Sequence, residues 1–326
     1  MGLMRRSWPY VALLLLVATG LIMARQRDAI MDWAILRGYH APSNVAQLAS
    51  QDTFSAYARR LFFVNKPQID DKQAFNRHCT NNTSDSVVVL GCYTGNRQGI
   101  FLYDVTDSRL NGIEQVTAAH EMLHQAYDRL SKSQRAHINA LLQQYYETSA
   151  SSDIKTQFAS YHKTEPGEEW NEMHSVIGTE VVTLPKSLED YYQQYFSNRS
   201  SIARFYQNYQ GEFTQRQQQI ASYDSQLDML KTQIDAKKSD LSAREASLTA
   251  QRSQMEQWKA AGQISAYNAA VPGFNAQVDS YRSELAAANQ LIDQYNSLLG
   301  QRNAIAVQEQ QLEQAVNSQV LSAAGQ

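Results

Sequence analysis

The sequence predicts a mainly helical α+β domain with a small β-sheet, followed by an all-α antiparallel coiled-coil hairpin. Three observations predict this fold class. Residues 113–130 carry apolar side chains at helical spacing around the motif HExxH. Short apolar runs bounded by turn residues precede that helix and are typical of strands. Beyond residue 199, apolar residues recur every seven positions over long distances, as they do in coiled coils.

Length, composition and charge limit the classes to which the protein can belong. A chain of 326 residues is long enough for two domains. With 43% hydrophobic residues and 18 tyrosines it can form a core, so it is not a disordered polyelectrolyte. Its 29 basic and 32 acidic residues give a net charge of −3. This balance gives no general affinity for nucleic acid.

The N-terminus has the pattern of a membrane segment. Arg5 and Arg6 precede an uncharged run at residues 8–24, which spans roughly 25 Å as a helix, near the lower limit for crossing a bilayer. The run can be an uncleaved signal anchor or a signal peptide cleaved near residues 18–20. Arg25 and Arg27 on the far side weaken the charge asymmetry. We favour a transmembrane signal anchor at residues 1–27, which makes the protein a single-pass protein of the cell membrane with the rest extracytoplasmic.

The region before the motif is expected to alternate between short helices and strands. Residues 28–57 have a helical pattern that breaks at residues 38–42, and Ser43 or Asn44 begins the second helix. Residues 61–64 and 87–90 are predicted as strands, and residues 100–105 as a strand that returns after a hairpin connection.

The two cysteines are candidates for one disulfide. Cys79 and Cys92 flank a turn-rich loop, and the compartment beyond a signal anchor is oxidising. Such a bond would hold the loop against the sheet. Metal binding by this pair is the weaker alternative, because the spacing fits no zinc knuckle.

The motif HExxH is the part of the sequence from which chemistry can be inferred. His120 and His124 lie one turn apart on one face of a helix, so two imidazoles can bind one zinc ion. Glu121 lies beside them, where it can take a proton from a water that the metal acidifies. The alternative is an ordinary amphipathic helix with two surface histidines. The uncharged flank at residues 116–119 and the apolar Met122 and Leu123 argue for a buried, metal-bearing helix.

This stretch resembles the active-site helix of zincin metallopeptidases, over residues 113–180. The metzincin pattern HExxHxxGxxH is absent, because neither its glycine nor its third histidine is in place. The thermolysin-like, or gluzincin, branch takes its third ligand from a glutamate on a later helix, often after an asparagine. Asn171-Glu172 matches that pattern, so the resemblance implies that Glu172 completes the zinc site. Val176 stands where thermolysin-like enzymes have an aspartate that supports the first histidine, so that support must differ here.

Other residues compete for these roles. The alternatives to Glu172 as third ligand are Glu180, Glu169, His174 and His162. Candidates for stabilising an oxyanion are Tyr161, His162 and His174.

Two further helical regions complete the catalytic domain, which is predicted to span residues 28–198. Residues 131–146 form one helix that begins at Ser131. Residues 188–206 are rich in aromatic side chains at helical spacing, and we expect one helix there that closes the domain.

The hairpin is predicted at residues 199–326 from two heptad runs on either side of a break at residues 260–274. The first run has apolar residues at Ile220, Leu227, Ile234, Leu241, Leu248 and Met255, while its companion positions become polar at Lys237, Arg244 and Gln251. The second run combines Val278, Leu285, Ile292 and Leu299 with Tyr281, Ala288 and Tyr295, and it is adjoined by a further apolar series at Leu291, Leu298, Ile305 and Leu312. Basic and acidic residues are nearly equal in number here, which excludes a nucleic-acid arm and favours a spacer or a docking arm for a protein partner.

The sequence therefore predicts a membrane-anchored, extracytoplasmic zinc peptidase of gluzincin type that acts on a peptide or protein substrate. His120, His124 and Glu172 are the expected ligands of Zn²⁺, and Glu121 is the expected general base and then acid. The alternative is a non-catalytic envelope scaffold with a structural or degenerate zinc site, in which the coiled coil carries the function.

Overall fold

The computed structural model describes residues 13, 15–20, 23, 26–79, 89–164 and 166–319. The chain divides into two compact units, one formed by residues 1–210 with 315–326 and the other by residues 211–314. The elements of the first unit are α2 (Arg27–Leu36), α3 (Ser43–Gln51), α4 (Ala56–Phe63), β1 (Gln68–Asp70), α5 (Lys72–His78), β2 (Gly91–Tyr93), β3 (Ile100–Tyr103), η1 (Ser108–Leu110), α6 (Ile113–Asp128), α7 (Lys132–Thr148), α8 (Ser152–Thr164), α9 (Glu169–Glu180) and α10 (Lys186–Tyr192). The helix α11 (Arg199–Ala260) begins in this unit.

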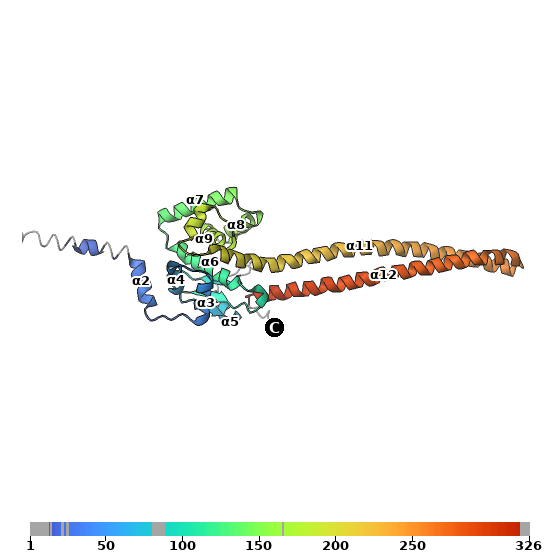
Figure 1. Ribbon diagram of the computed structural model, residues 1–326, viewed down its shortest axis with the longest axis horizontal. Coiled ribbons are helices and arrows are strands. Elements are labelled where there is room, and N and C mark those ends of the chain that lie inside the picture. Colours follow the sequence, from blue (N-terminus) through green and yellow to red (C-terminus); the bar gives the residue numbers. More distant parts are fainter. Residues whose placement is uncertain are drawn as a thin grey trace, which may run out of the picture. The chain divides into compact units, whose positions relative to one another are not determined.

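The helix α6, which carries the HExxH motif, forms the centre of the first unit. It packs against α9, α3, α4 and the strands β2 and β3. In Figure 1 it lies between α9 and the helices α3 and α4. Met122 and Leu123 are fully buried, and Gly178 of α9 lets the two helices approach closely. A Cβ at Gly178 would lie 2.5 Å from the Leu123 side chain, which is too short for a real contact.

A three-stranded sheet covers one side of α6, in the order β1-β3-β2. The strand β3 pairs parallel with β1 and antiparallel with β2. The central strand is therefore β3, and β2 is an edge strand of the described sheet. Cys92 of β2 forms a disulfide with Cys79 at the end of α5, which confirms the predicted bond. The loop between these elements lies largely outside the described residues.

A buried carboxylate ties three parts of this unit together. The Asp32 side chain on α2 is 1% exposed and pairs with Arg97 at 2.9 Å and with Arg129 at 2.8 Å. Arg97 lies in the turn between β2 and β3, and Arg129 follows α6. These ion pairs fix the end of the HExxH helix relative to the hairpin beside it.

Several local predictions are confirmed. Helices occupy the expected region before residue 57, with a break at residues 37–42 and a helix start at Ser43. The helix α7 begins after Ser131, whose side chain accepts from the Gln134 backbone in a capping box. The expected strand at residues 100–105 is present as β3, at Ile100–Tyr103.

Other local predictions are wrong. Residues 61–64 are not a strand: residues 61–63 end α4, because Ser55 caps that helix and Leu61 and Phe62 then face the core. Residues 89 and 90 precede β2 rather than form a strand, and residues 87 and 88 lie outside the described part. The expected single helix at residues 188–206 is two, α10 and the start of α11, with a break after Tyr192. A buried Arg199 at this break pairs with Glu189 of α10.

The predicted membrane anchor falls mostly on residues that the structure does not describe. Within the described part of the chain, no helix has both the length and the apolar character that crossing a bilayer requires.

The second unit consists of the rest of α11 and most of α12 (Ile264–Val316). A short turn at residues 261–263, with Gly262 at φ +72°, joins the two helices. They run antiparallel within this unit (Figure 1), since the partner of Asp224 is Arg302 and that of Gln251 is Gln277. The predicted break is shorter than expected, because Pro272 lies inside α12.

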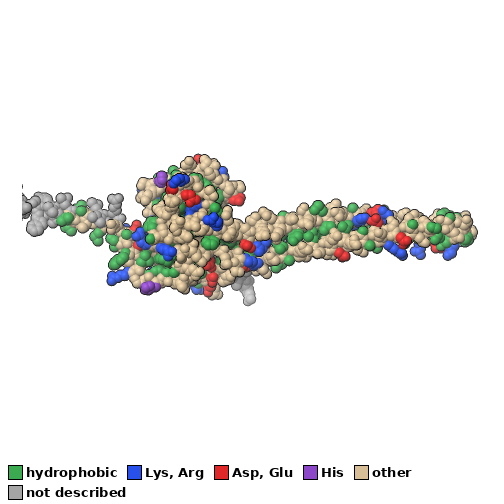
Figure 2. Space-filling model, in the orientation of Figure 1, with side chains coloured by type: hydrophobic (Ala, Val, Ile, Leu, Met, Phe, Trp, Pro, Cys, Tyr) green, Lys and Arg blue, Asp and Glu red, His purple; other side chains and the backbone are tan. Residues whose placement is uncertain are grey.

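Polar residues at the companion positions of the first heptad run make contacts between the two helices. Lys237, at a companion position of the first heptad run, forms an ion pair with Glu284. In the second run, Leu285 and Ile292 are exposed, so the prediction that they form the packed face is wrong. Ala288 of the other predicted series and Leu312 of the adjoining series are buried, as expected. On the face drawn in Figure 2, side chains of both charges are interspersed along the two helices.

Candidate metal centre

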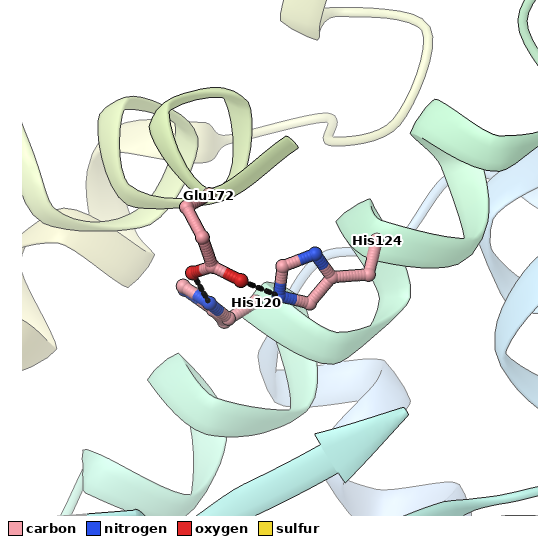
Figure 3. A group of neighbouring side chains, drawn as sticks. All are labelled: His120, His124 and Glu172. Carbon is pink, nitrogen blue, oxygen red and sulfur yellow. Dashed lines mark ion pairs between the residues drawn. The ribbon is translucent and has the colours of Figure 1, made fainter. Parts of the chain in front are cut away.

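The structure brings together the side chains of His120, His124 and Glu172. One ligand atom from each residue lies within 4.8 Å of the others. His120 Nε2 is 3.5 Å from Glu172 Oε2, and His124 Nε2 is 3.3 Å from Glu172 Oε1. Figure 3 shows the Glu172 carboxylate reaching from its helix to both imidazoles. Two nitrogens and one carboxylate that converge in this way form a donor set suited to zinc.

The two histidines come from α6 and the glutamate from α9. A helical spacing of four places both imidazoles on the same face of α6. The close packing of α9 on α6 then places Glu172 opposite them. Glu172 lies in the first turn of α9, where the helix dipole favours a negative charge.

Asn171 orients one of the histidines. Its Oδ1 lies 3.0 Å from His124 Nδ1, and Ser175 Oγ lies 3.5 Å from the same nitrogen. A proton on Nδ1 that is donated to Asn171 leaves the lone pair of Nε2 directed at the candidate site. The support therefore acts on the second histidine and comes from the residue just before Glu172. The Asn-Glu pair was visible in the sequence, but its role was not.

In the metal-free protein, charge holds the three groups together. Burial lowers the pKa of His120, but its hydrogen bond and charge interaction with Glu172 outweigh burial and raise this pKa to about 9. Burial raises the pKa of Glu172, but both histidines outweigh it and lower the value to about 2. His120 is therefore protonated and Glu172 ionised at neutral pH. A metal ion would replace that proton as the positive charge.

Glu121 is buried beside this group and does not belong to it. Burial raises its pKa, as suits a proton acceptor that works near neutral pH. The Tyr93 backbone of β2 hydrogen-bonds to its carboxylate. Gly91 of the same strand lies very close, since a Cβ there would be 2.7 Å from Glu121 Oε1 and 2.5 Å from Thr117 Cγ2. The edge strand thus fixes the position of the carboxylate, and nothing in the sequence pattern indicated this.

The other candidates for third ligand do not belong to the three-residue group. His174 is fully buried on another side of α9, where its Nε2 lies 3.0 Å from the Tyr191 hydroxyl and burial lowers its pKa to about 3. His162 is 74% exposed and pairs with Glu169 at 2.8 Å. Glu180 faces the same cleft as the histidines but is not part of the three-residue group.

A cleft of about 720 Å³ opens over the candidate site. Its walls include residues from β2, α6, α8, α9 and the first turns of α11, with His120, Glu121, His124 and Glu172 among them. Of the residues considered for stabilising an oxyanion, Tyr161 lines this cleft, while His162 and His174 do not. The structure adds Tyr206 and Tyr209 of α11 to the lining.

Taken together, the site contains a donor set for one metal ion, a buried carboxylate next to it and an open cleft. The chain matches no protein-family model, no curated protein and no solved structure.

Proposed function

We propose that the protein is a zinc-dependent peptidase of the zincin type, held at the cell membrane by its N-terminal segment with the catalytic unit outside the cytoplasm. The observation that carries this proposal is the convergence of His120, His124 and Glu172 in a cleft, with Glu121 buried beside them. The HExxH spacing and the glutamate from a second helix agree with the resemblance to gluzincins.

The residues fit a zinc ion, and their roles follow from their chemistry. His120 and His124 offer Nε2 and Glu172 offers a carboxylate oxygen. When bound, zinc supplies Lewis acidity that brings the pKa of a water to about 7. Glu121 takes the proton of the attacking water and then delivers it to the leaving amine. The edge strand β2 borders the cleft, and its backbone can hold an extended peptide by strand addition.

The proposal is tested with the full-length chain and mixtures of peptides. We expect about one zinc ion per chain and peptide hydrolysis that chelation removes and added zinc restores. A chain that holds zinc but hydrolyses no peptide would favour the scaffold alternative.

For the second unit, we propose that α11 and α12 form an antiparallel coiled coil that acts as a spacer or docks a protein partner. The contacts of Lys237 with Glu284 and of Asp224 with Arg302 support this pairing. A polar pair within an otherwise apolar seam fixes register in coiled coils.

Zinc uptake should depend on pH through His120. With its pKa near 9 in the metal-free protein, the ring must lose a proton before Nε2 can bind metal. The apparent zinc affinity should therefore rise up to tenfold per pH unit between pH 7 and 9 and level off above. Glu172, with a pKa near 2, stays ionised throughout this range. Zinc titration at buffered free-metal concentrations measures the slope, and a flat profile over pH 7–9 would contradict the prediction.

Replacing Gly91 with alanine should impair hydrolysis more than metal binding. The new Cβ would displace Glu121 or the strand itself, and a misplacement near 1 Å can cost roughly 100-fold in rate. We expect Gly91→Ala to lower kcat about 10- to 100-fold with zinc content unchanged. Gly211→Ala is the matched control, because nothing lies within 4 Å of its Cβ position. Equal activity of both variants would show that β2 does not position Glu121.

A further inference from the structure

The described residues that line the cleft carry an excess of negative charge. Lysine and arginine are absent among them, and the carboxylates are Glu121, Asp128, Glu168, Glu172 and Glu180. A zinc ion would balance Glu172 and Glu121. Three carboxylates are left over, so the electrostatic potential of the cleft favours a positively charged substrate.

Glu180 stands out among these three by its surroundings. It is the last residue of α9, two turns beyond Glu172, and its carboxylate interacts with His120 rather than with His124. Its hydrogen-bond partners are neutral: Gln157 Nε2 at 3.4 and 3.5 Å, and the Tyr206 side chain. By contrast, Asp128 pairs with Arg135 at 3.7 Å. Glu168 also has a neutral donor, Asn171 at 3.2 Å, but it is exposed and keeps its hydration.

A partly buried carboxylate whose hydrogen-bond partners are all neutral loses hydration without gaining a charged hydrogen-bond donor in return. A cationic nitrogen that entered this end of the cleft would neutralise the Glu180 carboxylate and replace its lost hydration. Tyr206 and Tyr209 line the same end, and the faces of aromatic rings attract cations. Together, Glu180, Gln157, Tyr206 and Tyr209 offer the groups that recognise an ammonium or guanidinium ion. We call these four residues the cation subsite.

We propose that the cation subsite binds a positively charged nitrogen of the substrate and so makes the enzyme selective for cationic peptides. This inference rests on the proposed peptidase function. Eight residues of helix separate Glu172 from Glu180, about 12 Å. An extended peptide rises about 3.3–3.6 Å per residue, so two residues cover about 7 Å. The length of a lysine or arginine side chain covers the rest, so a basic residue two positions from the scissile bond reaches the subsite. A free N-terminal amine at the same distance is the other source of the charge.

The test uses pairs of peptides that differ in one charge. One pair carries lysine or norleucine near the scissile bond, and the other has a free or an acetylated N-terminus. With the zinc-loaded full-length chain, we expect the charged member to be preferred. Glu180→Gln should lower kcat/KM for that member roughly 10- to 100-fold and change the neutral member by less than about threefold. If Glu180→Gln removes the preference in the lysine pair, the subsite binds a basic side chain. If it removes the preference in the N-terminal pair, the subsite binds the free amine.

Asp128→Asn is the matched control, because it removes the same charge one turn beyond His124, away from Glu180. It should keep most of the preference, and Glu180→Gln should keep its zinc. Equal loss for charged and neutral peptides in Glu180→Gln would overturn the proposal. So would the absence of a charge preference in the unmodified chain, even if that chain hydrolyses peptides and the proposed function holds.

Binding measurements separate this inference from the peptidase proposal. The Glu121→Gln chain loaded with zinc should bind the lysine or free-amine peptide more tightly than its neutral partner, and adding Glu180→Gln should remove the difference. If the unmodified chain hydrolyses nothing, the peptidase function fails. A preference in binding that depends on Glu180 would then still support the subsite, while equal or absent binding would overturn it.

Discussion

Glu121→Gln should abolish most hydrolysis while leaving zinc content and folding intact. The amide keeps the shape of the carboxylate in its buried position beside β2 but cannot accept the proton of water. Removing a general base of this kind costs about 10²–10⁴ in rate. Because Glu121 is not one of the three convergent donors, the zinc stoichiometry should stay near one. Steady-state kinetics on the preferred peptide and metal analysis of the same sample measure both effects.

The matched control is Glu147→Gln, the same substitution at an exposed site on α7. It should leave kcat/KM and zinc content unchanged. If Glu121→Gln kept full activity, Glu121 would not be the base and the proposed mechanism would fail. If the protein showed no hydrolysis before substitution and Glu121→Gln changed no property of it, the scaffold alternative would be favoured.

His124→Ala and Glu172→Ala should each lose zinc, and activity with it. Each substitution removes one of three donors, and bound metal stabilises the folded state. At free zinc 100-fold above the dissociation constant, that stabilisation amounts to about 2.7 kcal/mol. We therefore expect a lower melting temperature in the presence of zinc and little response to added metal. His124→Ala also leaves Asn171 without its imidazole partner. Thermal unfolding with and without zinc separates the metal effect from the packing effect.

His162→Ala and Glu169→Ala are the controls, since these residues pair with each other away from the site. Both variants should keep zinc and activity. Normal zinc binding by Glu172→Ala together with loss in Glu180→Ala would show that Glu180 is the third ligand. That result would also contradict the proposal that Glu180 belongs to a cation subsite.

The sequence was sufficient for features that depend on local spacing. The HExxH helix follows from apolar residues at helical intervals around residues 120–124, and α6 confirms it. Ser131 and Gln134 mark the start of α7 in the same way. Local patterns predicted the wrong element where a short apolar run is compatible with both a helix and a strand. Residues 61–64 were expected to form a strand, but the cap at Ser55 and burial of Leu61 and Phe62 place residues 61–63 in α4.

The paired helices α11 and α12 show a second limit of local patterns. Heptad spacing predicted the buried Leu227 and Leu241 of α11. It did not show which of two adjoining series on α12 faces the partner helix. Leu285 and Ile292 are exposed there, and Glu284 lies at the contact with Lys237. Which series faces the partner helix depends on how the two helices pair, and the periodicity of one helix gives no information on that pairing.

The sequence by itself determined that His120 and His124 share a helix face and that Glu121 lies beside them, because a helix fixes the relative directions of residues four apart. For the third donor it offered Glu172 with several competitors. Only the tertiary structure brought Glu172 to the histidines, placed Asn171 on His124, brought Gly91 against Glu121 and left Glu180 facing the cleft. The reason is physical: the packing of α9 and β2 on α6 decides which side chains meet across the cleft, and this packing depends on contacts between residues far apart in the chain.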